Sequence, residues 1–218
     1  MLKPQLPSIN DPEDCLVPTG LPAVVDAHVH VFPTTIFSAI WKWFDAHAWN
    51  IRYRLSTTQI FDFLLSHGVR HVVALQYAHK PGIARQLNRY MVEKCRRHPQ
   101  RLTGMATVFP GEENAREILQ EGFDLGLGGL KLHAHVQCFD MNAADMNDLY
   151  DCCRSNDKPV VMLVGREPKS TAYRCDPYRI CREDKLEREL KDFAGLKVCV
   201  HHQGFDEQVE SDGHGDEA

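Results

Sequence analysis

Short apolar runs alternate with stretches of helical periodicity from residue 23 onward. The apolar runs are rich in Val, Leu or small residues and end at Gly, Pro or charged residues, which is typical of buried strands. The predicted strands are Ala23–Val31, Val69–Tyr77, Leu102–Phe109, Gly128–His135, Pro159–Val164 and Leu196–His202. The predicted helices are Thr35–Ala48, Thr57–His67, Ile83–His98, Glu112–Leu125, Ala143–Asn156 and Glu183–Phe193. This order indicates a parallel sheet, either a doubly wound layer or a (β/α) barrel.

Two features of the strand ends favour the barrel. A doubly wound nucleotide-binding sheet carries a glycine-rich turn after its first strand, whereas the first strand here continues into His28-Val29-His30. Polar residues also collect where later strands end, and active sites of barrels form at that rim. They are Gln76, Tyr77, His133, His135, Arg166, Glu167, His201 and His202. The sequence predicts an α/β fold of the TIM-barrel type, incomplete because six strands do not close a barrel of eight.

The same pattern divides the chain into three segments. Residues 1–22 are expected to form an irregular lead-in, residues 23–207 the partial barrel, and residues 208–218 an acidic flexible tail. The 218 residues include 25 Lys+Arg and 30 Asp+Glu, a net charge of −5. Since no basic cluster stands out, nucleic acid and membrane surfaces are not expected partners.

Cysteine usage and the absence of long apolar runs point to the cytoplasm. No run approaches the ~20 apolar residues that a spanning helix needs, and the N-terminus lacks an apolar secretion segment. The eight cysteines occur in a chain long enough to build a core without cross-links. Reduced thiols are therefore expected rather than a disulfide framework.

Asp26-Ala27-His28-Val29-His30 is the sharpest local motif. Alternation along a strand puts Asp26, His28 and His30 on one face, with the two imidazoles about 7 Å apart. Imidazole nitrogens bind divalent metals when further ligands come from other strands, and two hydrogen-bonded core histidines are the alternative. Because two other strands also end in histidine, a metal-type site is favoured.

These residues belong to a wider resemblance over roughly residues 24–207. The chain resembles the amidohydrolase-related family of metal-dependent TIM-barrel hydrolases and decarboxylases, through DAHVH at 26–30, GLKLH at 129–133, PVVMLVGREP at 159–168 and VHHQGFDE at 200–207. The resemblance implies a divalent ion, with zinc expected, held by His28 and His30. It puts His202 at a position that contacts the metal or the reacting water, and His201 at one that is usually not a ligand.

The sequence departs from the family pattern in two ways. Leu163 stands where a fifth-strand histidine normally supplies a third metal ligand, and an isobutyl group cannot donate to a metal. The family's eighth-strand aspartate has no counterpart before residue 218. The hypothesis is a metal-dependent hydrolase of a small amide, ester or lactone, or a related decarboxylase. The alternative is a catalytically inactive, truncated barrel that serves as a binding or association module.

Other polar residues are candidates for the substrate site. His133 is expected to bind substrate, and His135 and Gln137 are expected either to contact substrate at the rim or to lie on a surface loop. Arg166 and Glu167 are expected either to recognise a substrate carboxylate or to form an ion pair that anchors their loop.

Three further features bear on the barrel. Lys131 is interpreted as a lysine salt-bridged inside the barrel, with a carbamylated, metal-bridging lysine as the less favoured alternative. The aromatic stretch Ile40–Trp49 predicts a helix packed on the core rather than a lid. Open sheet edges favour a homo-oligomer.

Overall fold

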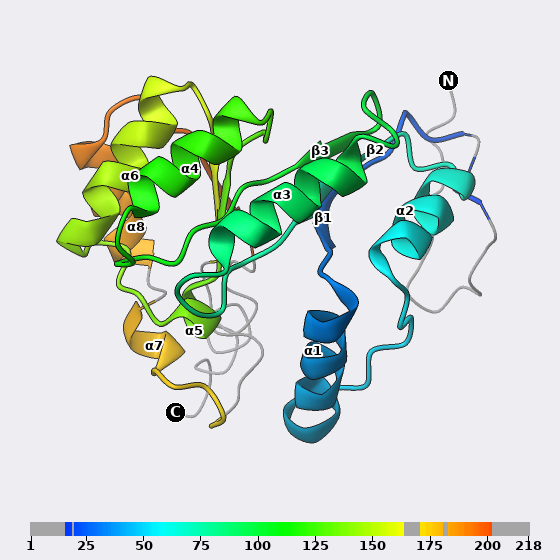
Figure 1. Ribbon diagram of the computed structural model, residues 1–218, viewed down its shortest axis with the longest axis horizontal. Helices are drawn as coiled ribbons and strands as arrows, with labels where there is room; N and C mark the ends of the chain where they lie inside the picture. The colour runs from blue at the N-terminus through cyan, green and yellow to red at the C-terminus, as the bar shows by residue number, and fades with distance from the viewer. Residues whose placement is uncertain (1–15, 19, 164–170, 181–182, 202–218) are drawn as a thin grey trace, which may run out of the picture.

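The computed structural model describes residues 16–18, 20–163, 171–180 and 183–201. Its strands are β1 (Val25–His30), β2 (His71–Leu75), β3 (Leu102–Gly104), β4 (Leu130–Leu132), β5 (Val160–Leu163) and β6 (Val198–His201). Its helices are α1 (Thr34–His47), α2 (Thr57–Ser66), α3 (Ala84–Cys95), α4 (Ala115–Asp124), α5 (Ala134–Gln137), α6 (Ala144–Ser155), α7 (Pro177–Ile180) and α8 (Glu183–Asp192). Each of the strands β1 to β5 is followed by at least one helix, and the predicted α/β order is confirmed (Figure 1).

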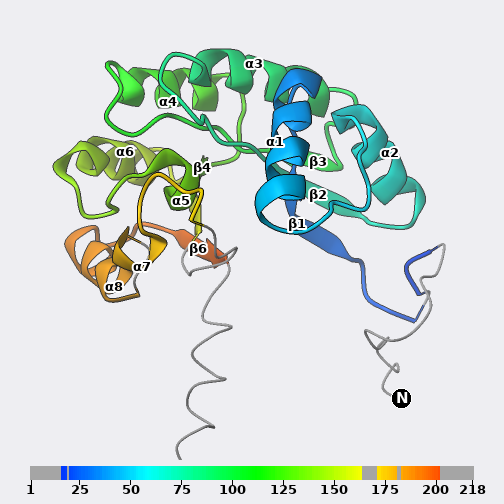
Figure 2. The same ribbon diagram turned by 90° about the horizontal axis from the view of Figure 1, so that it is seen from below.

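The strands are parallel and follow their order along the chain. They form two sheets, β1-β2-β3 and β4-β5-β6. A parallel bridge between Ala106 and Leu130 joins the sheets, and backbone N–H groups of Ala106 and Lys131 donate across this seam to Gly129 and Ala106. The helices run in an arc around the outside of the strands, as Figure 2 shows. The fold is thus a partial (β/α) barrel.

The six predicted strands and six predicted helices are all present, with boundaries shifted by a few residues. The prediction was wrong at the end of the fourth strand, because His135 lies in the short helix α5 rather than in β4. The backbone N–H of His133 donates to the side-chain Oε1 of Gln137 at 2.8 Å, so the chain turns there. Helix α7 was also not predicted.

Local sequence accounts for the ends of α2. Ser56 accepts a hydrogen bond from the backbone N–H of Gln59, and the Gln59 side chain accepts one from the backbone N–H of Ser56. This capping box satisfies two backbone donors that the first helical turn leaves free. Gly68 follows the helix with φ of 98°, a left-handed conformation that glycine adopts without steric cost.

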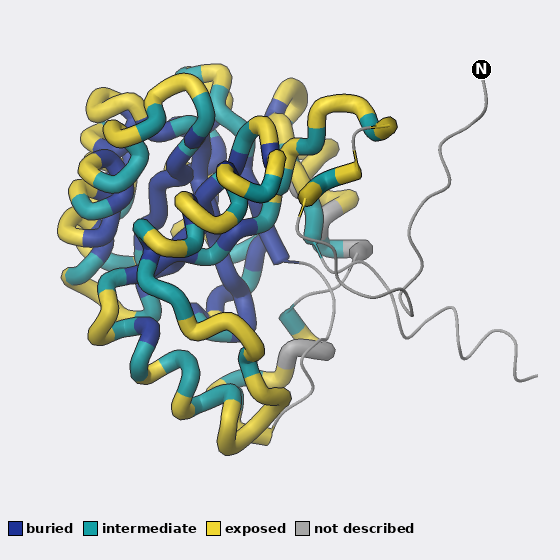
Figure 3. Tube along the Cα trace, turned by 90° about the vertical axis from the view of Figure 1, so that its right-hand side faces the viewer, coloured by how far each residue is buried: buried dark blue, intermediate teal, exposed yellow. Residues whose placement is uncertain are grey.

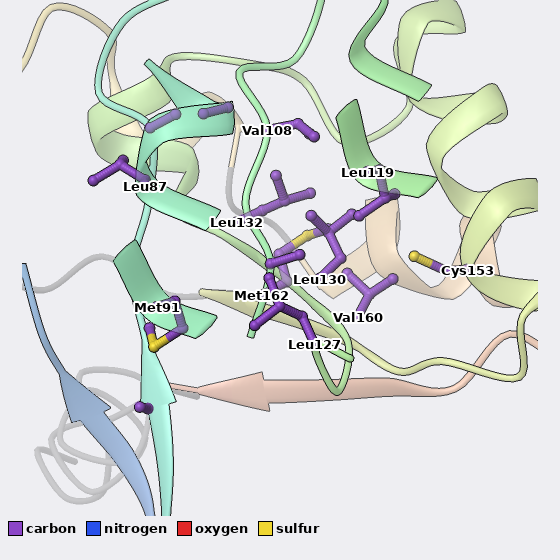
Figure 4. Packing of buried hydrophobic residues seen from close by; sticks show 14 of the residues in the cluster. Leu87, Met91, Val108, Leu119, Leu127, Leu130, Leu132, Cys153, Val160 and Met162 are labelled. Carbon is purple, nitrogen blue, oxygen red and sulfur yellow. The ribbon is translucent and has the colours of Figure 1, made fainter. Parts of the chain in front are cut away.

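Alternate residues of each strand face two different apolar layers. Leu130, Leu132, Val160 and Met162 pack outward with helix residues such as Leu119, as Figure 4 shows. Leu75, Met105 and Val161 form a separate cluster on the other face, inside the barrel. Buried segments are accordingly concentrated in the strands, while the helices expose their outer faces (Figure 3).

Two further observations concern membrane-spanning helices and cysteines. No helix in the described ranges is long and apolar enough to cross a membrane. The six cysteines within those ranges are free thiols: Cys95, Cys138, Cys152, Cys153, Cys175 and Cys199. The predicted acidic tail, residues 208–218, and most of the predicted lead-in lie outside the described residues.

Candidate metal centre

His28 and His30 lie much closer together than strand alternation predicts. Their Nε2 atoms are 3.0 Å apart and their ring centroids 4.9 Å apart. The register between β1 and β2 shifts between Asp26 and Val29, so β1 contains an irregularity at this point. The backbone N–H of His28 donates to Oδ1 of Asp26 at 3.1 Å within it. The expected separation of about 7 Å was therefore wrong, and Asp26 does not share a regular alternation with the two histidines.

The 3.0 Å separation suits two adjacent ligands of one ion. Two nitrogens bound to one ion at about 2.0–2.1 Å lie about 2.9 Å apart at an angle of 90° and about 3.4 Å apart at a tetrahedral angle, and 3.0 Å falls within this range. In the described arrangement one imidazole donates a hydrogen bond to the other, so one ring carries its proton on Nε2. An ion bound by both Nε2 atoms would displace that proton.

His201 on β6 brings a third imidazole to this pair. Its ring centroid is 4.1 Å from that of His28, with the two planes at 81°. The Sγ of Cys199 lies 3.7 Å from Nε2 of His201. The sequence interpretation had set His201 aside in favour of His202, which lies outside the described residues. Side chains alternate between the two faces of β6, which puts His201 and Cys199, both possible metal donors, on the same face. This pattern could have identified His201 from the sequence.

The register of β5 and β6 places Leu163 beside this cluster. Leu163 pairs with His201, and Val161 pairs with Cys199. Val161 belongs to the interior cluster, whereas Leu163 packs in the main core cluster. Leu163 is buried. The position that lacks a donor therefore lies next to an imidazole that contacts His28.

Aromatic and imidazole rings extend the cluster along the strand ends. The Tyr77 ring lies 5.6 Å from His30 and 4.7 Å from His133, and His133 lies 5.7 Å from His135. Burial, helped by the nearby Tyr173, raises the pKa of Tyr77 well above its usual value. Tyr77 therefore stays a neutral phenol that can donate a hydrogen bond. The sequence had noted Tyr77 as a polar strand-end residue without giving it a role.

His133 and His135 are both buried, which excludes the surface-loop alternative for His135. Gln137 is buried beside them, and its Nε2 donates to the carbonyls of Ala78 and Val108 at 3.0 and 2.7 Å. Gln137 therefore ties three strand ends together. The remaining two predicted substrate residues, Arg166 and Glu167, lie outside the described residues.

Helix α1 covers one side of the strand ends. Phe37 packs against Phe32, which contacts Tyr77, and these three form a cluster apart from the main core. Figure 1 shows α1 on the same side of the strands as α5 and α7. Trp43 contacts Tyr173, which in turn contacts His135, each at 5.2 Å. Ile40 and Trp41 of this aromatic stretch pack against the cluster of Phe32, Phe37 and Tyr77, so the predicted core-facing helix is found, packed on this smaller cluster at the strand ends.

Lys131 lies inside the barrel without the expected ion pair. Its side chain is fully buried, and Nζ has no hydrogen-bond partner among the described residues. Burial lowers the pKa of Lys131 to about 8, an effect slightly offset by Cys199. Neither a salt bridge nor a metal bridge for Lys131 is found in the described part of the chain.

The described residues supply a pair of metal donors and a neighbouring imidazole rather than a complete ligand set. No group of three or more His, Cys, Asp or Glu side chains within the described ranges is arranged to hold a metal ion. The donor chemistry of His28 and His30 fits a divalent ion, but a third donor would require movement of His201 or a residue outside those ranges.

Comparison with known proteins relates the chain to one family. A sequence profile of the amidohydrolase family matches residues 25–216. No curated protein matches the chain at a significant level.

Several solved structures share the fold. A probable 2-pyrone-4,6-dicarboxylic acid hydrolase from Acinetobacter baumannii, with citric acid bound, is 18% identical over 82% of this chain and 58% of that chain, with a TM-score of 0.51. The 5-carboxyvanillate decarboxylase from Novosphingobium aromaticivorans, complexed with manganese and 4-hydroxy-3-methoxy-5-nitrobenzoic acid, is 16% identical. The match covers 81% of this chain and 64% of that chain, with a TM-score of 0.60. A 2,6-dihydroxybenzoate decarboxylase complexed with 2,6-dihydroxybenzoate is 15% identical over 83% of this chain and 67% of that chain, with a TM-score of 0.58. The chain spans less than two thirds of the first two, and such low identity relates the folds alone.

Proposed function

Because this chain belongs to the amidohydrolase family, we propose that it is a divalent-metal-dependent hydrolase or decarboxylase of a small molecule. The substrates proposed are a small amide, ester or lactone for hydrolysis, or a small carboxylic acid for decarboxylation. The observation that carries this proposal is the 3.0 Å approach of the His28 and His30 nitrogens at the strand ends. Free thiols support a reducing, cytoplasmic location.

His28 and His30 would hold the ion, and zinc is the ion we propose. His202 is proposed as the third donor and as the contact to the reacting water, and the contact of His201 with His28 makes it a second candidate. When bound, a divalent ion polarises a carbonyl or carboxylate oxygen and lowers the pKa of water.

The side chains around the pair would bind and orient the substrate. His133 and His135 would supply imidazole contacts, and Arg166 with Glu167 would recognise a carboxylate. Neutral Tyr77 would donate a hydrogen bond to a substrate oxygen, since its raised pKa keeps the phenol protonated. The aromatic rings of α1 would exclude water from one side.

Removing both pair histidines is expected to abolish metal binding. The variant His28→Ala plus His30→Ala removes the two imidazoles whose Nε2 atoms lie 3.0 Å apart, so its affinity for Zn²⁺ and Mn²⁺ should fall by at least about tenfold. Isothermal titration and metal analysis of the purified protein measure this change.

A matched control removes two imidazoles at the opposite end of the barrel. His67 follows α2 and His98 follows α3, before the strands begin. The variant His67→Ala plus His98→Ala should bind metal as the parent does. Equal metal content in the parent and the His28→Ala plus His30→Ala variant would overturn the proposed metal centre.

A second candidate function is a catalytically inactive barrel that associates with other chains. Leu163 beside His201 and the incomplete donor set favour it. In the described ranges β1 pairs with β2 and β6 pairs with β5, so each keeps one open edge. We expect the purified chain to elute as a dimer or larger species in size-exclusion chromatography with light scattering. A stable monomer across micromolar concentrations would contradict this candidate.

A further inference from the structure

Two thiols from distant segments meet beside His135. Cys138 ends helix α5, and Cys175 lies in the segment of residues 171–176 that precedes α7, here called the strap. The Sγ of Cys138 and the Sγ of Cys175 each lie 3.6 Å from the backbone carbonyl oxygen of His135. Both sulfurs donate toward one acceptor, so they are neighbours although 37 positions separate them in the sequence.

The two thiols also interact with each other and differ in exposure. Burial, helped by a hydrogen bond with the Cys138 thiol, raises the pKa of Cys175 to about 12. Cys138 is exposed, whereas Cys175 is half-buried. An oxidant from solvent therefore reaches Cys138 first, and Cys175 stays a protonated thiol held next to it.

We propose that Cys138 and Cys175 form a reversible disulfide that fastens the strap to helix α5. The proposal does not depend on the metal or on the reaction of the family. It is also distinct from a disulfide framework, because the remaining described cysteines are not involved. Cys152 and Cys153, for example, are buried in α6.

A low-molecular-weight disulfide such as glutathione disulfide would serve as the oxidant. The Cys138 thiolate attacks one glutathione sulfur, forms a mixed disulfide and releases a glutathione thiolate. Cys175 then loses its proton and attacks the Cys138 sulfur, which releases the second glutathione. Two protein thiols are oxidised, one glutathione disulfide is reduced to two thiols, and the two protons pass to the released thiolates through solvent.

The disulfide would act on the aromatic cover of the strand ends. Tyr173 is two residues from Cys175 and contacts both His135 and Trp43. Fastening Cys175 to α5 would keep Tyr173 between these two rings. The strap would then open less often, since local opening would require more of the surrounding structure to unfold.

Peptide mapping of the full-length chain tests the bond directly. Cleavage before aspartate releases residues 124–139 and 157–175, which contain Cys138 and Cys175 as their single cysteines. Reduced protein is incubated with millimolar glutathione disulfide, blocked with N-ethylmaleimide and digested. We expect most chains to yield the linked pair of peptides, and dithiothreitol to separate them. The Cys138→Ser and Cys175→Ser variants should lack the link, and Cys152→Ser should retain it.

Tryptic cleavage after Arg174 tests the effect on the strap. Arg174 is exposed in the reduced chain. Oxidation should slow this cleavage at least about tenfold in the parent and in Cys152→Ser, but not in Cys175→Ser. The proposal fails if Cys138 and Cys175 carry only separate glutathione adducts or if they pair with other cysteines. It also fails if trypsin cuts the disulfide-linked chain after Arg174 as fast as it cuts the reduced chain.

Discussion

Replacing Lys131 by methionine is expected to raise the free energy of unfolding by about 3 kcal/mol at pH 7. The Lys131 ammonium is fully buried without a hydrogen-bond partner in the described structure, and its pKa falls to about 8 from an ordinary 10.5. Each unit of pKa shift corresponds to about 1.4 kcal/mol, and methionine has a similar length without the charge. Urea denaturation of the parent and Lys131→Met measures the difference, without added metal.

The gain should depend on pH in a defined direction. Below pH 8 the amine is charged in both folded and unfolded chains, so the parent bears the full cost of burying the charge. Between pH 8 and 10.5 the unfolded chain binds more protons than the folded chain, and the stability of the parent rises with pH. At pH 10 the advantage of Lys131→Met should shrink to about 1 kcal/mol or less.

The exposed Lys80 provides the control, since Lys80→Met removes a charge without relieving burial. It should change the unfolding free energy by less than about 0.5 kcal/mol at either pH. If Lys131→Met destabilises the chain at pH 7, the lysine has a partner in the folded protein and its burial is not a cost.

Replacing Leu163 by histidine is expected to strengthen Zn²⁺ and Mn²⁺ binding by at least about 100-fold, or about 2.7 kcal/mol. Leu163 pairs with His201, whose ring contacts His28, so an imidazole at position 163 would lie next to this histidine cluster. Three protein ligands are usual for catalytic zinc, whereas two hold an ion weakly. Titration calorimetry with each metal measures the change in affinity.

Two further variants separate coordination from a general effect of polarity. Leu163→His and Leu163→Asn both bury a polar group, so both should lower the stability of the chain. The Asn amide is a much weaker metal donor than imidazole, so Leu163→Asn should not gain metal affinity. Combining Leu163→His with His28→Ala should remove most of the gain, because the two positions would act on one ion. An affinity unchanged in Leu163→His would mean that position 163 does not face the pair.

The fold was largely predictable because its evidence is local. Apolar runs of strand length, helical periodicity, the Ser56 cap and Gly68 all act within a few residues, and the structure confirms the elements that they predict. The end of β4 was mispredicted because the turn depends on the Gln137 side chain four residues ahead of His133. No pattern of apolar residues reports such a hydrogen bond.

The site was predictable in its residue types but not in its spacing. The register with the partner strand β2 shifts between Asp26 and Val29, and alternation alone overestimated the separation of the His28 and His30 rings, whose centroids are 4.9 Å apart. The contact of His201 with His28 spans 173 positions in sequence and depends on the curvature of the whole sheet. The meeting of Cys138 with Cys175 likewise depends on where the strap crosses α5.

The seam at Ala106 divides the candidate donors between two halves of the molecule. His28 and His30 belong to the sheet β1-β2-β3, whereas His201 and Leu163 belong to β4-β5-β6. An ion bound by donors from both sheets would link the two halves across the open side of the barrel. Variants with higher metal affinity would then also resist mechanical opening more strongly. The cation would have a structural role in this chain as well as a chemical one.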